Sequence, residues 1–141
     1  GIAKRLKEYD SKIKIIAMEP EKMPLLSEGK IIESHKIEGI GDDFIPELVD
    51  KKIIDKIITV DDNDAINMAR LLAKKLGLGV GISSGANFLA CVLSGYNKTV
   101  TIFCDDLKKY LSTDLNKDIN KDKTLISNQI EIISIEYIEK E

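Results

Sequence analysis

The chain has 141 residues, of which 43% are hydrophobic and 32% charged. This length and mixture are typical of one globular domain and too apolar for a disordered chain. Lysine and arginine number 21 and aspartate and glutamate 24, so the net charge of −3 excludes bulk attraction to nucleic acid or an anionic membrane. No apolar run approaches the roughly 20 residues of a membrane span. The first residue is glycine rather than methionine, and we expect the chain to begin inside a longer gene product.

The first sixty residues predict a helix end, two strands and a long loop. Residues 1–10 carry apolar side chains at helical spacing, and Lys14–Met18 is an apolar run that Pro20 should stop. Residues 21–44 contain proline, three glycines and mixed charge, which indicates a long loop with at most one helical turn. Loops of this length in compact domains are usually functional. Lys56–Val60 predicts the second strand.

The next segment predicts two helices and a third strand. Acidic residues 61–64 can cap a helix over 65–76, which Gly77 should end. Two serines, Ser83 and Ser84, are expected to cap a second helix made of small residues, Gly85–Ser94. Thr99–Cys104 predicts a third strand, followed by a short helix that ends at Leu111. This alternation predicts an α/β fold with a mainly parallel sheet flanked by helices.

The remaining residues divide the chain into three parts. Residues 1–115 are expected to form the α/β portion, and 116–125 to form a charged, solvated linker. Residues 126–141 are rich in isoleucine and fit either a two-faced strand or a helix face, and the β-branched composition favours a strand.

The cysteines and the single histidine exclude several kinds of site. Cys91 and Cys104 cannot form a disulfide framework or a four-ligand zinc site, and both are expected to be small buried hydrophobic residues. His35 is expected to be a solvated loop residue. With one histidine, a histidine metal cluster is impossible, and we predict no metal site.

Three segments could carry chemistry, because ligands of open α/β sheets bind at the carboxyl ends of strands. Lys36–Gly41 holds two glycines that permit close approach of the backbone to a ligand, or an ordinary turn. Gly81–Ala86 offers free amides and hydroxyls to an anion or a polar cofactor edge, or a plain serine cap. Asp105 and Asp106 can receive a proton or a cationic ring nitrogen, or cap the next helix.

Four short motifs occur along the chain in an order that resembles a known family. They are Glu19-Pro20, HKIEGIG-x-DFIP at 35–46, GISSGA at 81–86 and DDLKKYLSTDL at 105–115. Together they resemble the C-terminal half of the cysteine synthase (O-acetylserine sulfhydrylase) and cystathionine β-synthase family. These are fold type II pyridoxal-phosphate enzymes with the tryptophan-synthase β fold. The resemblance covers about residues 1–115.

The resemblance implies a cytoplasmic, homo-oligomeric enzyme that replaces the β-substituent of a serine-derived amino acid with sulfide or a thiol. Its small-molecule substrates would be O-acetylserine with sulfide or homocysteine, and a serine acetyltransferase tail is a further candidate partner. The cofactor would bind between two α/β domains. Positions implied to contact it are Gly39, Ser83, Ser84 and Asp106, and those implied for the active-site loop are Glu38, Ile40 and Gly41. No catalytic residue is expected in this chain, because the Schiff-base lysine lies upstream in the family.

Two positions depart from the family pattern. Asp106 stands where a serine hydroxyl normally contacts the pyridine nitrogen; it either contacts that nitrogen directly or turns away to cap a helix. Glu38 and the residues after it are more like cystathionine β-synthase, whereas Lys108–Thr113 is more like cysteine synthase. The sulfur acceptor therefore stays open. A non-catalytic binding module derived from the family is the alternative of a different class.

Overall fold

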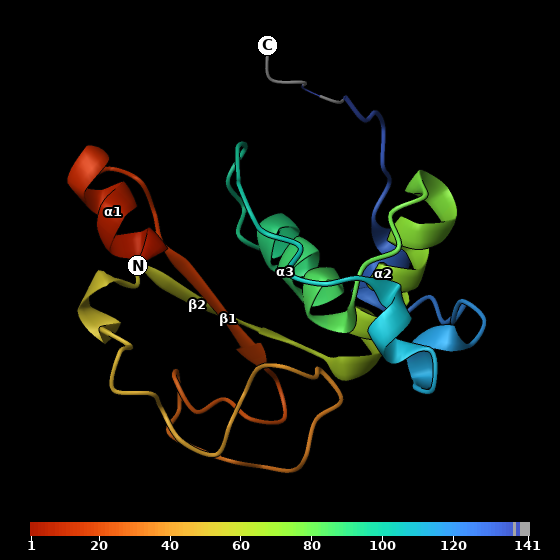
Figure 1. Ribbon diagram of the computed structural model, residues 1–141, viewed down its shortest axis with the longest axis horizontal. Coiled ribbons are helices and arrows are strands. Elements are labelled where there is room, and N and C mark those ends of the chain that lie inside the picture. Colours follow the sequence, from red (N-terminus) through yellow and green to blue (C-terminus); the bar gives the residue numbers. More distant parts are fainter. Residues whose placement is uncertain (137, 139–141) are drawn as a thin grey trace.

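The computed structural model describes residues 1–136 and 138 and shows α/β alternation along the chain (Figure 1). The helices are α1 (Ile2–Tyr9), α2 (Asp62–Leu76) and α3 (Ile82–Leu93), and the strands are β1 (Ile16–Pro20) and β2 (Lys56–Val60). The described residues also form short 3-10 helices, namely η1 (Lys51–Ile53), η2 (Leu107–Tyr110), η3 (Asp114–Asn116) and η4 (Ile126–Gln129). None of the helices in the described part of the chain is long and apolar enough to cross a membrane.

The two strands pair in parallel, as the alternation predicts. Ile16 pairs with Lys56 and Pro20 with Val60 at the two ends of the register. The first strand runs two residues further than predicted and includes Glu19 and Pro20. Proline is tolerated there because it is the last residue of the strand and needs no further ladder hydrogen bond.

Helix α2 begins and ends where its sequence predicts. The Asp61 side chain accepts hydrogen bonds from the amides of Asn63 and Asp64, which satisfies two free donors of the first turn. Gly77 closes the helix in the left-handed conformation at φ 70°, which glycine adopts without steric cost.

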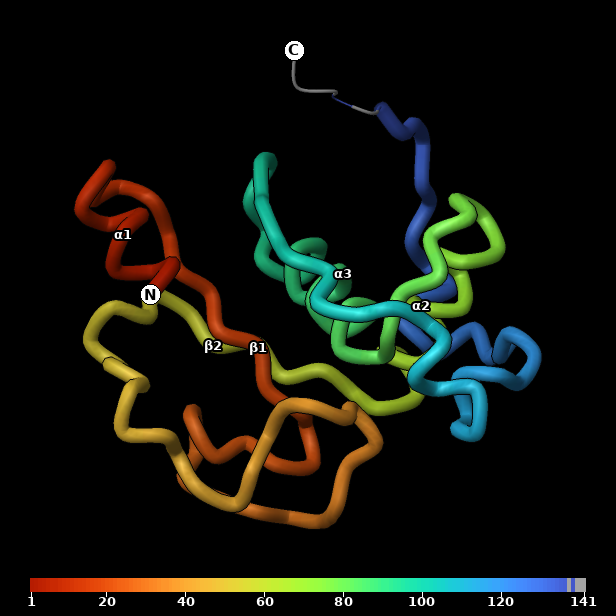
Figure 2. The backbone as a smooth tube through the Cα atoms, in the orientation of Figure 1, coloured from red at the N-terminus to blue at the C-terminus, as the bar shows by residue number. Residues whose placement is uncertain are grey.

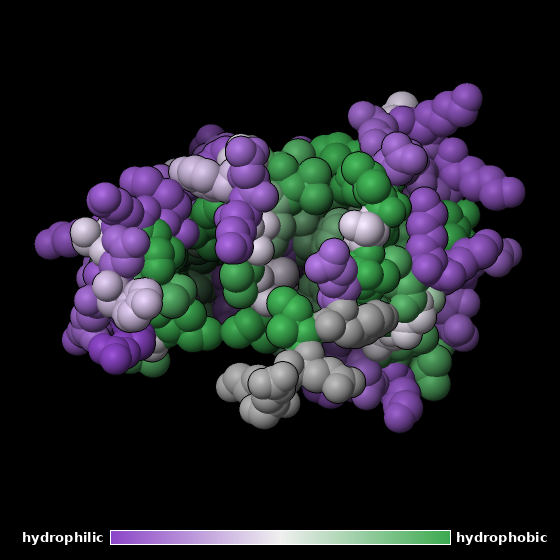
Figure 3. Space-filling model, turned by 90° about the horizontal axis from the view of Figure 1, so that it is seen from above, coloured by the Kyte–Doolittle hydropathy of each residue, from purple (hydrophilic) through white to green (hydrophobic). Residues whose placement is uncertain are grey.

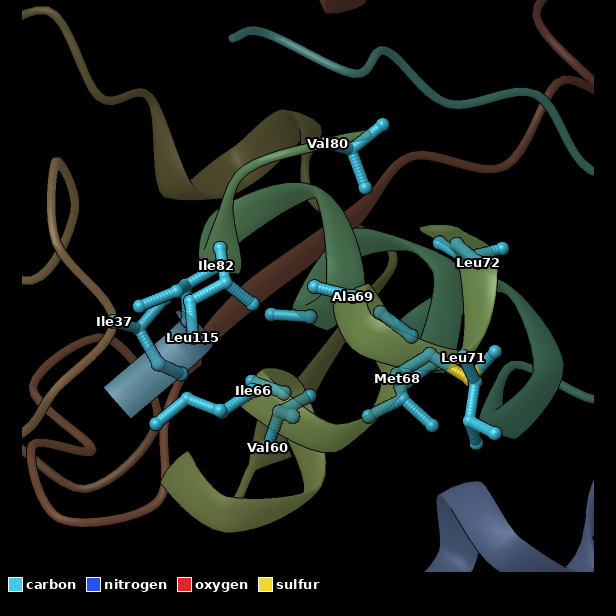
Figure 4. Packing of buried hydrophobic residues seen from close by; sticks show 14 of the residues in the cluster. Ile37, Val60, Ile66, Met68, Ala69, Leu71, Leu72, Val80, Ile82 and Leu115 are labelled. Atoms are coloured by element: carbon cyan, nitrogen blue, oxygen red, sulfur yellow. The ribbon is translucent and has the colours of Figure 1, made fainter. Parts of the chain in front are cut away.

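Helices α2 and α3 approach so closely that a side chain at Gly85 has no room. A Cβ atom at Gly85 would lie 2.3 Å from the Ala65 carbonyl oxygen and 2.8 Å from the Ala69 amide nitrogen. Small residues on both helices therefore bring the backbones together, and α3 lies between α2 and the sheet (Figure 1). Figure 4 shows the core around this contact, where Ile37 from the long loop lies beside Ile82 and Leu115.

The long loop between β1 and η1 forms no helix or strand, as predicted, but it is firmly anchored. Glu19, only 4% exposed, accepts hydrogen bonds from the Leu26 and Ser27 amides at 2.7 and 3.1 Å. Ile37 is completely buried further along the loop. The loop therefore leaves β1 in a fixed direction and returns beneath the carboxyl end of that strand (Figure 2).

The prediction of a third strand at 99–104 is wrong. This segment crosses in front of α3 (Figure 2) and lacks a strand partner in the described ranges 1–136 and 138. Val100 and Ile102 are 92% and 53% exposed. Their sequence suits a strand, but a strand also needs a neighbour to hydrogen-bond with. Cys104 is exposed and Cys91 half-buried, so the expectation that both are buried is also wrong.

The C-terminal segment follows the surface of α2 rather than forming the predicted strand. Residues 126–129 form η4, and 130–136 form no regular structure; Tyr137 and residues 139–141 of the predicted strand lie outside the described residues. Asp64 accepts the Ser127 amide at 2.8 Å, and Asn67 accepts the Asn120 amide at 2.8 Å. Residues 116–125 are thus held against α2 at Asn120, where a solvated linker was expected.

Replacing Gly85 by alanine should destabilise the chain by about 2–3 kcal/mol, because the new methyl group meets backbone atoms that cannot rotate away. Gly79→Ala is the matched control, since its Cβ would meet only the Leu107 side chain, at 3.6 and 3.9 Å, which is ordinary van der Waals contact. Urea unfolding measures both. Equal midpoints for the two variants would contradict the close approach of α2 and α3.

Candidate functional site

The start of α3 is an open helix N-terminus. Gly81 occupies the N-cap position, and no side chain caps the helix. The expectation that Ser83 and Ser84 cap the helix is wrong, because both lie inside its first turn and are buried, with 7% and 0% exposed. The Ser84 hydroxyl is buried without a hydrogen-bond partner among the described residues. Free amides, the positive end of the helix dipole and a buried hydroxyl together suit a polar or anionic ligand edge.

The segment around Asp106 pairs directly with the residues that precede α3. The Gly81 amide donates to the Asp105 carbonyl at 3.1 Å, and the Leu107 amide donates to the Gly79 carbonyl at 2.9 Å. Val80 and Asp106 form the antiparallel bridge between these bonds. Two of the three predicted site segments, 24 residues apart, are therefore adjacent in the fold.

Asp106 is exposed and caps η2 with one oxygen. Its Oδ1 accepts the Lys108 amide at 2.8 Å. Its Oδ2 makes no hydrogen bond within the part of the chain that the structure describes. The capping role considered for this residue is therefore observed, and it leaves one carboxylate oxygen available to a ligand.

The glycine loop at 36–41 is shaped by two positive φ angles. Gly39 and Gly41 have φ 85° and 68°, conformations that side chains rarely adopt. Glu38 and Gly39 are exposed at the tip, whereas Ile40 and Gly41 are half-buried. The loop is held from below by the buried Ile37, so its tip is presented by a fixed base.

An ion pair joins this loop to η3. Lys36 Nζ lies 2.6 Å from Asp114 Oδ2, and Lys117 also binds this carboxylate. The hydrogen bonds from Lys117 and Lys36 lower the pKa of Asp114 to about 2. Arg70 on α2 hydrogen-bonds the Asp114 carbonyl, so η3, α2 and the loop are connected.

His35 is part of the loop's support, and the expectation of a solvated residue is wrong. Its Nε2 lies 3.0 Å from the Gly41 carbonyl oxygen. A carbonyl can only accept, so Nε2 donates and carries the proton. A Cβ at Gly41 would lie 2.6 Å from His35 Nε2 and 3.0 Å from Pro20 Cγ. Glycine is therefore required at 41 both by φ and by space, and the loop is fixed at the carboxyl end of β1.

Tyr110 contacts both Asp105 and Gly81, although the sequence pattern assigned it no role of its own within the motif at 105–115. Its hydroxyl donates to Asp105 Oδ2 at 2.6 Å, and its ring is 5% exposed. This hydrogen bond, burial and the negative charges of Asp105 and Glu38 raise the pKa of Tyr110 to about 12. Ile37, at the base of the glycine loop, lies beside Ile82 on α3 (Figure 4), so the loop lies near the paired segments. The only sequence signal was one aromatic residue in a charged stretch.

The arrangement suits a flat, polar organic cofactor. It offers an open helix N-terminus, a buried hydroxyl, a free carboxylate oxygen and exposed backbone at Gly39, all near the carboxyl end of β1. Among residues 1–136 and 138, no three histidine, cysteine or acidic side chains gather as metal ligands do. A ligand site at strand ends beside a helix N-terminus is the arrangement of an α/β enzyme domain.

Comparison with known proteins identifies the family to which this α/β domain belongs. The family described as "Pyridoxal-phosphate dependent enzyme" matches residues 1–105. Cysteine synthase B of Campylobacter jejuni is 47% identical over 119 residues, which are 82% of this chain and 39% of that protein. Cystathionine beta-synthase of Apis mellifera is 37% identical over 120 residues, 79% of this chain and 24% of that protein.

A solved structure supports the same assignment. The hydrogen sulfide-producing enzyme Fn1055 from Fusobacterium nucleatum is 46% identical, with a TM-score of 0.83 over 95% of this chain and 42% of that one. The chain therefore belongs to the pyridoxal-phosphate-dependent enzyme family and has the α/β fold of its cysteine synthase-like members. It spans about two fifths of the length of Cysteine synthase B.

Alanine at Gly41 should cost more stability than alanine at Gly39. Both variants force a side chain to a positive φ, which costs about 1 kcal/mol, but only the Gly41 methyl group meets His35 and Pro20. We expect a further loss of about 1–2 kcal/mol for Gly41→Ala in urea unfolding. In the double variant His35→Ala/Gly41→Ala this extra loss should shrink. Additive effects of the two substitutions would show that His35 does not pack on Gly41.

Proposed function

We propose that this chain forms the C-terminal part of a cysteine synthase, which makes L-cysteine from O-acetylserine and sulfide by β-replacement. The observation that carries the proposal is the pairing of Gly79–Gly81 with Asp105–Leu107 at the start of α3, where Ile37 also brings the base of the Glu38–Gly41 loop beside Ile82 (Figure 4). The 47% identity to a cysteine synthase supports the reaction class. We include in this proposal that the full-length enzyme is a cytoplasmic homodimer.

The residues of this chain would hold one side of pyridoxal phosphate, which supplies an electron-withdrawing ring when bound. Gly39 would bring its backbone close to the reacting end of the substrate, since no side chain stands in the way. Ser83 and Ser84 would line the ring at the α3 N-terminus. Glu38, Ile40 and Gly41 would form the loop that covers the substrate and excludes water.

The free oxygen of Asp106 would accept a hydrogen bond from the protonated pyridine nitrogen. A carboxylate stabilises a protonated ring nitrogen by charge pairing, which a serine hydroxyl cannot do. A protonated ring withdraws electrons more strongly. The bond from Lys108 to Oδ1 orients the carboxylate and supports this role.

The chain would be inactive by itself. In the proposed enzyme the Schiff-base lysine lies in a part that this chain does not supply, so the cofactor has no covalent attachment here. A non-catalytic binding module is the alternative of a different class, with a serine acetyltransferase tail as its candidate partner.

Titration with pyridoxal phosphate and borohydride tests this division. We expect no stoichiometric, borohydride-stable adduct and no β-replacement by the 141-residue chain, but both in the full-length enzyme that contains it. One stoichiometric adduct at a single lysine of this chain would contradict the proposal. Cofactor binding by neither protein would favour the non-catalytic module.

The acceptor is tested by product analysis of the full-length enzyme. Sulfide with O-acetylserine should yield cysteine, whereas homocysteine would yield cystathionine if the rival reaction holds. The resemblance to a hydrogen sulfide-producing enzyme favours a second candidate, in which cysteine and water yield hydrogen sulfide, pyruvate and ammonia. The relative kcat/KM of the three reactions decides among them.

Replacing Asp106 by serine should lower the pKa of the bound cofactor's ring nitrogen by about one unit or more, because a charge partner is removed. Serine remains a good N-cap, so η2 should stay formed. The measurement is the pH dependence of the ¹⁵N chemical shift of labelled pyridoxal phosphate in the full-length enzyme. An unchanged titration would mean that Asp106 does not face the nitrogen.

The chain alone should self-associate at tens of micromolar. Hydrophobic side chains gather across the middle of one face (Figure 3), and α2, α3 and the C-terminal segment enclose an apolar groove of about 630 Å³. The exposed segment at Val100 and Ile102 adds backbone without a strand partner among the described residues. Sedimentation should show dimers or larger species, and Ile102→Lys should shift them toward monomer. Leu48→Lys, at a 98% exposed loop position, is the control. A clean monomer in the unmodified chain would contradict this prediction.

A further inference from the structure

Asp105 and Tyr110 enclose the residue from which α3 starts. A Cβ at Gly81 would lie 2.1 Å from Asp105 Oδ1 and 2.7 Å from Tyr110 Cε2. The backbone at Gly81 has φ −74°, which any residue can adopt. A side chain at position 81 would therefore have to displace Asp105 and Tyr110, and the constraint comes from these two side chains and not from the backbone conformation.

The two side chains hold one another in this position. The Tyr110 hydroxyl donates to Asp105 Oδ2 at 2.6 Å, and Lys109 Nζ lies 3.7 Å from the same oxygen. The Asp105 side chain is 14% exposed. Its backbone carbonyl accepts the Gly81 amide at 3.1 Å, so both the side chain and the main chain of Asp105 act on Gly81.

Stability alone does not account for this carboxylate. Asp105 Oδ1 is buried and has no hydrogen-bond partner within the described residues, which is unfavourable for a charged oxygen. An apolar side chain would avoid this cost but would give the Tyr110 hydroxyl no acceptor. A tyrosine hydroxyl is protonated at neutral pH in any case, and the raised pKa of Tyr110 keeps it a donor at alkaline pH as well.

We infer that Tyr110 and Asp105 are a positioning pair whose hydrogen bond fixes Gly81, and with it the Ser83–Ser84 turn, at the distance from Asp106 that the cofactor ring needs. This inference rests on the proposed function. Neither side chain touches the cofactor in this role. They act through Gly81, because the turn carrying both serines begins there. The pair also explains how Tyr110, the last residue of η2, can influence the start of α3.

The test uses the full-length enzyme with four substitutions. Tyr110→Phe removes the donor, and Asp105→Ala removes the acceptor. Asp105→Asn keeps a carbonyl that can accept the Tyr110 hydroxyl. Tyr96→Phe is the control at a half-exposed tyrosine outside the site. Each variant is compared for pyridoxal-phosphate dissociation, for hydrogen exchange of the peptide covering 79–86, and for thermal stability.

Tyr110→Phe and Asp105→Ala should each weaken cofactor binding about tenfold and speed exchange at 79–86, as expected for the loss of one charge-assisted hydrogen bond. Asp105→Asn should recover most of both properties, and Tyr96→Phe should change neither. If a variant fails to fold, the contrast between Asp105→Asn and Asp105→Ala decides.

Unchanged affinity and unchanged local exchange in Tyr110→Phe would overturn the inference. So would faster exchange spread evenly over the whole molecule, because that is the sign of a general structural role. If the unmodified enzyme itself does not bind pyridoxal phosphate, the proposed function fails. The exchange pattern at 79–86 then still decides whether the pair fixes Gly81.

Discussion

The close approach of α3 to α2 at Gly85 is the constraint on which the site depends. With 2.3 Å between a hypothetical Cβ and the Ala65 carbonyl, the first turn of α3 can lie in only one place against α2. Gly81, four residues earlier, is then fixed relative to the core. The segment at 105–107 forms backbone hydrogen bonds with Gly79 and Gly81. The third site segment reaches the same region through Ile37, which is buried beside Ile82 (Figure 4).

The site is built largely from backbone and from side chains that support backbone. Gly41 and Gly81 leave space that His35 occupies at the first position and Asp105 and Tyr110 occupy at the second. Asp106, beside the start of α3, is exposed and uses one carboxylate oxygen to cap η2, which leaves the other for a ligand. A chain that spans about two fifths of the length of Cysteine synthase B thus carries a candidate site whose shape comes mainly from its backbone.

Local sequence was sufficient where local interactions decide the structure. Helix α2 was predictable because Asp61 caps it and Gly77 ends it, and the strand at Lys56–Val60 was predictable from β-branched residues. The segment at 99–104 has the same composition but depends on a neighbouring strand, which no local pattern can supply. The site loops were identified from motif order, whereas His35 and Tyr110 were not, because their roles arise from contacts with Gly41 and Asp105 that only the fold creates.

The most direct test of this account is a structure of the full-length enzyme with pyridoxal phosphate bound. The account predicts the cofactor between the Glu38–Gly41 loop and the start of α3, with Asp106 Oδ2 within about 3.5 Å of the ring nitrogen. A cofactor bound elsewhere, or a ring nitrogen that faces water while Asp106 only caps η2, would contradict it.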